Sequence, residues 1–148
     1  MRKILIILLL SVISLFASGV KWENDYHSAI KEAKKQNKPV LFISSRHTCK
    51  YCVVLDETTL RDARVVDGLN RDFISVISYS DERDYMPREL WRPGTPAIWF
   101  LLPSGEPMFE PVMGAIDANN FLKALTIVKE EFKKRQKKEK NDFYKLKK

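Results

Sequence analysis

The sequence predicts one α/β domain, in which helices flank a central mixed β-sheet. Three observations support this prediction. Short apolar runs alternate with amphipathic helical patterns, a Cys-x-x-Cys pair closely follows the first run, and a proline stands at the head of the third. At 148 residues, with 45% hydrophobic and 30% charged residues, the chain has room for a single domain with a core of its own.

The N-terminus has the order of a secretory signal. Residues 1–3 are a charged start, residues 4–16 are an apolar stretch of 13 residues interrupted by two serines, and residues 17–19 are small. This stretch is shorter than the ~20 residues that a spanning helix needs, so we expect cleavage after Ala17 or Gly19 rather than an uncleaved anchor. The segment 1–19 therefore predicts a signal peptide, and with it a periplasmic or other redox-managed location.

An amphipathic helix ending near Asn37 is expected to open the domain. Pro39 stops this helix, and the apolar run Val40 to Ser44 predicts a strand buried on both faces. A second helix starts at the cysteines and continues through Leu55, followed by a helical piece over residues 63–69. The first helix is indicated by apolar residues at helical spacing, namely Trp22, Tyr26, Ala29, Ile30 and Ala33.

Two further strands and a hairpin complete the predicted sheet. Residues 72–80 and 97–102 are apolar enough for strands, and a polar loop over residues 81–89 separates them. The turn at residues 103–106 leads into an antiparallel strand over Met108 to Val112, with Gly114 at its end.

Asp117 is expected to cap the last helix, whose apolar face carries Phe121, Leu125, Val128 and Phe132. Beyond Phe132 the apolar periodicity stops. The tail that follows predicts a solvent-exposed or frayed helix, although contact with anionic lipid headgroups or an acidic partner is an open alternative.

The net charge of +7 is concentrated at the two ends of the chain. Residues 129–148 carry ten Lys and Arg against four Asp and Glu, a surplus of +6, and Arg2 with Lys3 add +2. About −1 is left for the remainder, so the body has no basic field with which to hold a phosphate backbone. Nucleic acid is therefore not an expected partner.

Both cysteines of the chain lie in the segment His47-Thr48-Cys49-Lys50-Tyr51-Cys52. If Cys49 lies at the start of a helix, the unpaired N–H groups there favour its thiolate, the form that attacks disulfides. Cys52 lies on the same helical face and can resolve a mixed disulfide. A zinc site would need His27 and His47, which are not spaced as the usual distal pair. A purely structural bridge would close too short a loop to stabilise much.

The order of elements, the Cys-x-x-Cys pair and Thr95-Pro96 resemble the thioredoxin fold. More narrowly, Trp22, the segment Ala29 to Phe42 with Lys38-Pro39, and Cys49 to Cys52 look like the thioredoxin-like family of secreted or periplasmic proteins. The resemblance covers about residues 21–130. With the signal peptide at 1–19 and the basic helical tail at 133–148 outside the resemblance, the thioredoxin-like domain is expected at 20–132.

In that family the proline that matches Pro96 is cis, and the backbone of the residue before it pairs with an extended substrate segment. The resemblance thus implies that Thr95 and Pro96 form a substrate ledge beside the cysteines. Trp91, just before this loop, is a candidate groove residue exposed to substrate, although a buried Trp is an open alternative.

The chain departs from the family pattern at two positions. Many thioredoxins have a buried acid six residues before the first cysteine, where this chain has Ile43, so no acid/base residue is assigned. The aromatic residue that often precedes the first cysteine is replaced by Thr48, which is a candidate helix cap. His47 and Lys50 are each expected to be surface residues with a modest electrostatic effect on Cys49.

These observations predict a periplasmic thiol-disulfide oxidoreductase with Cys49 as nucleophile and Cys52 as resolving cysteine. No cofactor or metal is expected beyond the redox-active Cys49–Cys52 pair. Expected partners are secreted proteins with disulfides or thiols and a redox partner that resets the cysteines. Lys50-Tyr51, together with Thr95 before Pro96, is similar to secreted isomerases and reductases more than to strong oxidases. This resemblance implies reduction or isomerisation, including apocytochrome maturation.

Two other classes of function remain open at this point. The Cys-x-x-Cys pair is also suited to binding and delivering a soft metal such as Cu(I). A non-catalytic thioredoxin fold would instead use its groove to bind peptides.

Overall fold

The computed structural model describes residues 19–147. The predicted signal peptide therefore lies, apart from Gly19, outside the described residues. Within the described part, no helix combines the length and the apolar character needed to cross a membrane.

Four strands form one mixed sheet, β1 (Val40–Ser45), β2 (Ile74–Tyr79), β3 (Ala97–Leu101) and β4 (Val112–Met113). Their spatial order is β2-β1-β3-β4. The β1 strand pairs in parallel with β2 and antiparallel with β3, and β3 pairs antiparallel with β4. The predicted α/β class with a mixed central sheet is confirmed.

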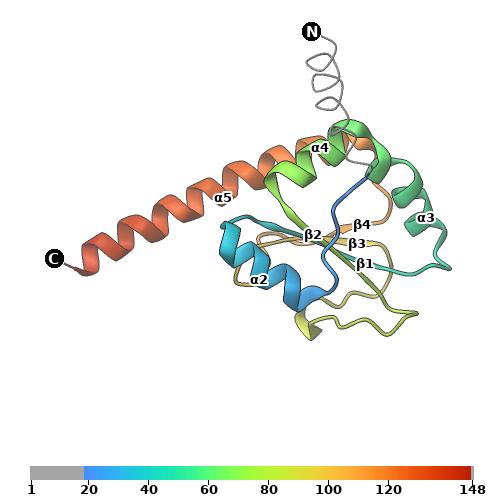
Figure 1. Cartoon of the computed structure of the whole chain (residues 1–148), viewed down its shortest axis with the longest axis horizontal. Coiled ribbons are helices and arrows are strands. Elements are labelled where there is room, and N and C mark those ends of the chain that lie inside the picture. The colour runs from blue at the N-terminus through green and yellow to red at the C-terminus, as the bar shows by residue number, and fades with distance from the viewer. Residues whose placement is uncertain (1–18, 148) are drawn as a thin grey trace, which may run out of the picture.

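Helices cover both faces of this sheet (Figure 1). They are α2 (Tyr26–Gln36), α3 (Lys50–Glu57), α4 (Ala63–Asp72) and α5 (Ala118–Leu146), with 3-10 turns at Thr59–Arg61 and Arg88–Leu90. One core cluster joins the sheet to α3, α4 and α5, and the other joins it to α2. The central strand β1 supplies Leu41 and Ile43 to the first cluster and Val40 and Phe42 to the second, so it is buried on both faces as predicted.

The first helix begins four residues later than the sequence suggests. Asp25 is its N-cap, and its side chain accepts a hydrogen bond from the Ser28 backbone N–H while the Ser28 hydroxyl accepts one from the Asp25 N–H. This capping box fixes the start of the helix at Tyr26. The expectation that Trp22 lies on the helix is wrong, because Trp22 instead forms a parallel bridge with Ser75 on the β2 edge of the sheet.

Two strand boundaries also differ from the prediction. Asp72 belongs to the end of α4 rather than to the second strand. The expected strand over Met108 to Val112 is wrong except at its last residue, because β4 is only Val112–Met113. Pro107 and Pro111 have no N–H to donate to a ladder, and between them Met108 turns into the core.

The α5 helix packs against α4 and the sheet in the first core cluster. Asp117 caps α5 as predicted, accepting a hydrogen bond from the Asn120 N–H at 3.0 Å. The predicted apolar face is confirmed, since Phe121, Leu125, Val128 and Phe132 are all buried.

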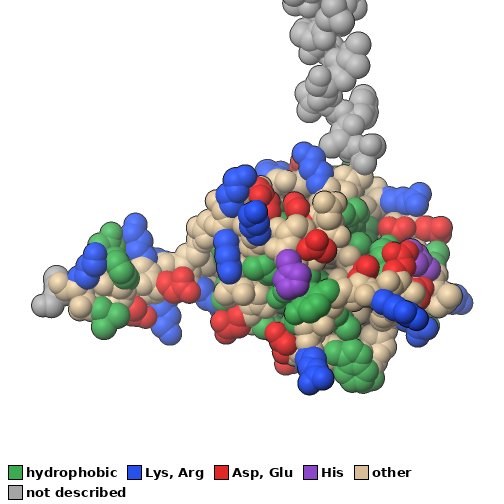
Figure 2. Space-filling model, turned by 60° about the horizontal axis from the view of Figure 1, so that its bottom comes forward, with side chains coloured by type: hydrophobic (Ala, Val, Ile, Leu, Met, Phe, Trp, Pro, Cys, Tyr) green, Lys and Arg blue, Asp and Glu red, His purple; other side chains and the backbone are tan. Residues whose placement is uncertain are grey.

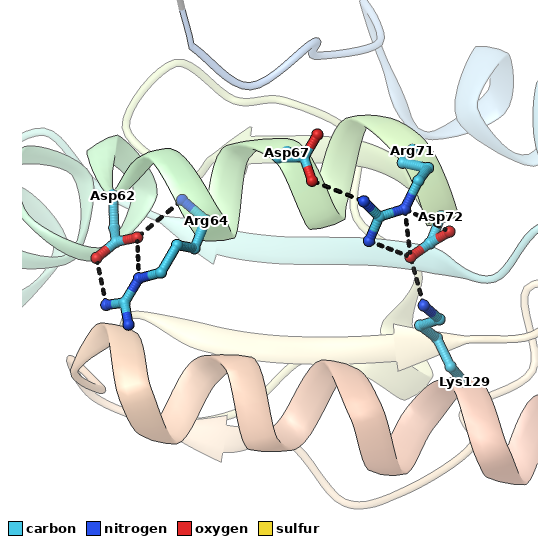
Figure 3. Close-up of polar contacts among 6 residues, drawn as sticks. All are labelled: Asp62, Arg64, Asp67, Arg71, Asp72 and Lys129. Carbon is cyan, nitrogen blue, oxygen red and sulfur yellow. Dashed lines mark hydrogen bonds and ion pairs between the residues drawn. The ribbon is translucent and has the colours of Figure 1, made fainter.

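Polar contacts reinforce this packing at both ends of α4 (Figure 3). Asp62 caps α4 and pairs with Arg64, which also donates to Asn119 of α5. At the other end, the Asp72 carboxylate accepts from Lys129 of α5 at 2.5 Å. Partial burial raises the pKa of Asp72, but hydrogen bonds and charge from Lys129 and Arg71 outweigh this influence and hold that pKa below its usual value.

We expect Asp72→Asn to lower the free energy of unfolding by about 1 kcal/mol at neutral pH, since the pair is only partly buried. A depressed carboxyl pKa contributes stability above the unfolded value of about 4, and this contribution is lost as pH falls through the folded pKa. The difference between variant and wild type should therefore shrink below about pH 4. Urea melts at several pH values measure it. Asp67→Asn, on the same helix but bonded only to the exposed Arg71, is the matched control and should have a smaller effect.

Candidate active site

The two cysteines lie where the central strand turns into α3. After β1 ends at Ser45, the backbone N–H of Cys49 donates to the Arg46 carbonyl, which closes a tight turn. Cys49 is the N-cap of α3 and keeps an extended backbone conformation, with φ −89° and ψ 115°. The predicted order of strand, turn and cysteine-bearing helix is confirmed.

The sulfur of Cys49 makes two hydrogen bonds with backbone groups. Its Sγ accepts from the backbone N–H of Cys52 at 3.2 Å, and the thiol donates to the carbonyl oxygen of Thr95 at 3.2 Å. The first contact is with one of the unpaired N–H groups at the start of a helix. The second joins the sulfur to a loop that is 46 residues away in the sequence.

The pKa of Cys49 lies below its ordinary value. Partial burial, the largest single influence, raises this pKa, but hydrogen bonding with Cys52 and with the Thr95 side chain lowers it. The backbone N–H groups of Cys52 and Tyr51 lower it further. The start of α3 therefore favours the Cys49 thiolate.

Cys52 is in a different environment. Its side chain is 5% exposed, and both cysteines are free thiols in this structure. A cavity of about 160 Å³ lies beside Cys52, and its lining includes Ile43, Ile77, Asp56 and Tyr79. Ile43 stands where thioredoxins often have a buried acid, and it is paired in register with Ile77, so this part of the lining is apolar.

The loop of Thr95 and Pro96 reaches the cysteines as the resemblance implied. The Thr95–Pro96 peptide bond is cis. The Pro96 carbonyl accepts from the Gly114 N–H at 2.9 Å, which ties the loop to the strand at the sheet edge. Its hydrogen bond with Cys49 places the Thr95 backbone directly beside the sulfur.

Segments next to the cysteines and the Thr95–Pro96 loop in the sequence or the fold carry exposed apolar side chains. Trp91 is 58% exposed, so of the two alternatives for this residue the exposed one holds. Tyr51 on α3 and Met113 on β4 are also exposed. Met113 lies beside the loop, because a Cβ atom added at Gly94 would lie 3.7 Å from its Cε. Sequence reasoning missed Met113, since no local pattern links it to Gly94.

Sequence reasoning also missed Arg92, whose guanidinium binds backbone carbonyls just before the Thr95–Pro96 loop. The guanidinium lies 4.6 Å from the ring centroid of the buried Trp99. It donates to the carbonyls of Glu89 and Trp91 and pairs with Glu110 at 3.2 Å. Arg92 thus holds the backbone on which Trp91 is presented, and it is a positioning residue rather than one that touches the sulfurs.

Three residues that flank Cys49 in the sequence, namely His47, Thr48 and Lys50, were also candidates for a role at the site. Thr48 is not the helix cap, and that expectation is wrong, because the sulfur of Cys49 itself takes the capping position. His47 is exposed, stacks on Tyr79 at 4.0 Å between ring centroids and contacts Glu82 at 2.6 Å. Lys50 is exposed as expected. Across residues 19–147, no group of three or more His, Cys, Asp or Glu side chains is arranged to hold a metal ion.

Comparison with known proteins places this geometry in context. A family model described as a thioredoxin-like domain matches residues 26–129. Spermatogenesis-associated protein 20 of Rattus norvegicus is 31% identical over 64 residues, which are 43% of this chain and 8% of that protein. The same protein of Mus musculus matches to the same extent.

Solved structures share the fold. A thioredoxin from Thermus thermophilus has a TM-score of 0.63 and 24% identity, over 74% of this chain and 87% of that one. The reduced C-terminal domain of DsbD from Neisseria meningitidis has a TM-score of 0.55 and 22% identity, over 68% and 90%. A structure described as DsbH oxidoreductase has a TM-score of 0.56 and 16% identity, over 81% and 89%.

We expect iodoacetamide to modify Cys49 well before Cys52, because Cys49 is the more exposed sulfur and has the depressed pKa. A lowered pKa means that the thiolate persists to lower pH, so the rate of Cys49 alkylation should rise through a midpoint below the ~8.5 of a free thiol. Mass spectrometry of timed samples over a pH series measures both rates. Thr95→Val should raise the midpoint, since it removes one of the hydrogen-bonding side chains. Equal rates at the two cysteines would contradict the assignment.

Proposed function

The chain belongs to the thioredoxin-like domain family, and on this basis we propose that it is a thiol-disulfide oxidoreductase. One observation carries the proposal. The sulfur of Cys49 caps α3 and also contacts the Thr95 carbonyl, so a reactive thiol lies beside a backbone edge that can hold a polypeptide. The structural neighbour DsbH is an oxidoreductase, which supports the same class of reaction. The predicted signal peptide at residues 1–19 supports the further proposal that it acts outside the cytoplasm.

The reaction proceeds in two exchanges. The Cys49 thiolate attacks one sulfur of a substrate disulfide, forms a mixed disulfide and releases the other substrate sulfur, which takes up a proton. Cys52 then loses its proton and attacks Cys49, which frees the second substrate sulfur. Two electrons pass from the protein to the substrate, and the protein is left with a Cys49–Cys52 disulfide. A dithiol protein or another thiol reductant must then reduce this bridge before the next cycle.

The substrate is a secreted protein with an accessible disulfide. An extended segment pairs with the backbone at Thr95 in the manner of an added strand. The exposed rings of Trp91 and Tyr51 and the Met113 side chain then contact its side chains. Such apolar contacts are tolerant of sequence, which suits an enzyme with several clients. We favour reduction or isomerisation over oxidation, and reduction of cysteines awaiting cofactor attachment is one such task.

Cys52 must give its proton to an acceptor in the second exchange. The buried acid of many thioredoxins is absent, since Ile43 and Ile77 fill that place. The cavity beside Cys52 instead reaches Asp56, one helical turn further along α3 and exposed to solvent. Desolvation and the nearby Asp56 charge raise the pKa of Tyr79 in the same lining, so Tyr79 stays a neutral donor. We assign Asp56 as proton acceptor, through water in the cavity.

We expect Cys52→Ala to stop the reaction after the first exchange, because no second sulfur is left to attack Cys49. Mixed disulfides should then accumulate on Cys49, and non-reducing gels with mass spectrometry would identify the clients. Cys49→Ser should abolish both trapping and turnover of insulin disulfides. Stoichiometric retention of copper with no disulfide turnover would instead favour the soft-metal alternative. Activity in cells that survives Cys49→Ser would favour a peptide-binding role.

We expect Asp56→Asn to slow the second exchange roughly tenfold, a modest general-base effect because water at the cavity mouth can still accept the proton. The first exchange should keep its rate, since the pKa of Cys49 is set by Cys52 and Thr95. Rapid-quench kinetics with a peptide disulfide separates the two steps. Glu57→Gln, the neighbouring carboxylate in the same lining, is the matched control. Equal loss in both steps, or in both variants, would remove Asp56 from the proton path.

A further inference from the structure

The C-terminal part of α5 extends beyond the body of the molecule (Figure 1). Its last polar contacts with the body are made by two neighbouring residues. Arg135 donates to the Met108 carbonyl at 3.1 Å, and Gln136 donates to Asn37 at 2.8 Å. Beyond them the helix continues to Leu146, and residues 137–147 are exposed throughout. The boundary expected at residue 132 is therefore a position within one continuous helix.

Charge is sharply divided between this extension and the body. Residues 133–148 carry nine Lys and Arg against two acidic residues, a net +7, whereas residues 19–132 carry a net −2. Among the described residues, the lysines of the extension form no ion pair with a carboxylate, while Arg135 pairs with Glu131. The positive charge of the extension is thus not neutralised by the protein itself.

Two apolar side chains continue the core-facing stripe past the end of the core. Phe121, Leu125, Val128 and Phe132 recur every three or four residues and are buried. The same spacing reaches Phe143 and Leu146, which are 55% and 88% exposed. Tyr144 beside them is 58% exposed. In Figure 2 the protruding end of the helix carries blue and green side chains with no part of the body against them.

We propose that this extension, residues 133–148, docks on an anionic lipid surface. A helix with lysines around exposed aromatic and aliphatic side chains has the composition of interfacial helices, in which apolar groups enter the headgroup region and lysines contact lipid phosphates. Four to eight basic residues on such a helix are typical of binding to acidic lipids. The membrane accommodates both features, whereas a polyanion such as nucleic acid would leave Phe143 and Leu146 exposed.

A second copy of the chain suits the extension less well. Two apolar side chains bury far less than the ~1,000 Å² that a stable dimer needs. Pairing two such extensions would also bring together two segments of net +7. The cysteines lie at the opposite end of the molecule from the C-terminus of α5 (Figure 1), so lipid contact leaves the site open to clients.

Vesicle binding by the full chain tests the proposal. The quantity measured is the ratio of binding to vesicles with about 30% phosphatidylglycerol over binding to pure phosphatidylcholine, at unsaturating lipid and about 0.1 M salt. This ratio isolates the charge-dependent contribution, because apolar residues 4–16 are common to every variant and both lipids. We expect wild type to favour the anionic vesicles at least tenfold, and about 0.5 M salt to remove the preference.

Two variants with four Lys→Gln substitutions each distinguish the position of the positive charge from the total charge of the protein. Lys137→Gln, Lys138→Gln, Lys140→Gln and Lys145→Gln in one chain should lower the ratio at least tenfold, since each basic group near such a surface contributes roughly a factor of five. The same change at Lys31, Lys34, Lys35 and Lys123, which are exposed on the body, alters the net charge equally and should lower it less than twofold. Unchanged melting temperatures show that each variant is folded.

The apolar contribution has its own pair of variants. Phe143→Ser with Leu146→Ser should weaken binding to anionic vesicles, whereas Ile127→Ser, exposed on the body part of α5, should not. Equal loss in the two four-lysine variants would overturn the proposal, as would an unchanged ratio. A concentration-dependent dimer lost on tail substitution would assign the surface to a second copy instead. Insulin turnover should be the same in all four variants, so loss of lipid binding is distinguishable from failure of the proposed redox function.

Discussion

The hydrogen bond from the Cys52 N–H to the sulfur of Cys49 is the interaction on which the site depends. Helix N-termini leave N–H groups without partners, and a side-chain oxygen usually accepts from them. Here a sulfur takes that place. The helix therefore begins next to the residue whose ionisation it stabilises. Hydrogen bonding with Cys52 and the Thr95 side chain, together with the backbone N–H groups of Cys52 and Tyr51, favours the thiolate without a neighbouring base. The same sulfur reaches the Thr95 carbonyl, so the fold must bring the loop of a distant strand to the start of α3.

The central sheet supplies that geometry. The β1 strand is buried on both faces and ends at Ser45, while β3 runs antiparallel beside it and begins directly after Pro96. The C-terminal end of β1 and the N-terminal end of β3 therefore lie side by side at the same end of the strands. Arg92 then fixes the approach of the loop through the face of the buried Trp99. The start of α3 and the Thr95 loop thus meet at one sulfur because the strands that lead to them are neighbours.

Local signals predicted most of this arrangement, and contacts between distant residues account for the rest. Both cysteines and the Asp117 cap are recognisable from residue type and spacing alone, whereas the place of Pro96 beside the cysteines was implied by the family resemblance. Trp22 was misplaced because its apolar character fits a helical pattern, and only its bridge to Ser75 shows that it lies along the sheet edge. Arg92 and Met113 carry no local signal, since their partners are Trp99, Glu110 and Gly94.

The replacement of a buried acid by Ile43 divides the site into two regions with different demands. Ile43 and Ile77 make one part of the cavity beside Cys52 apolar, whereas Asp56 and Glu57, both exposed, line another part of it. A buried carboxylate in that place would carry a desolvation cost of its own. With acceptor groups at the solvent edge of the cavity, the folded state avoids this cost, and the proton travels further instead. At this position, isoleucine therefore favours the stability of the core, whereas a carboxylate would favour the speed of the second exchange.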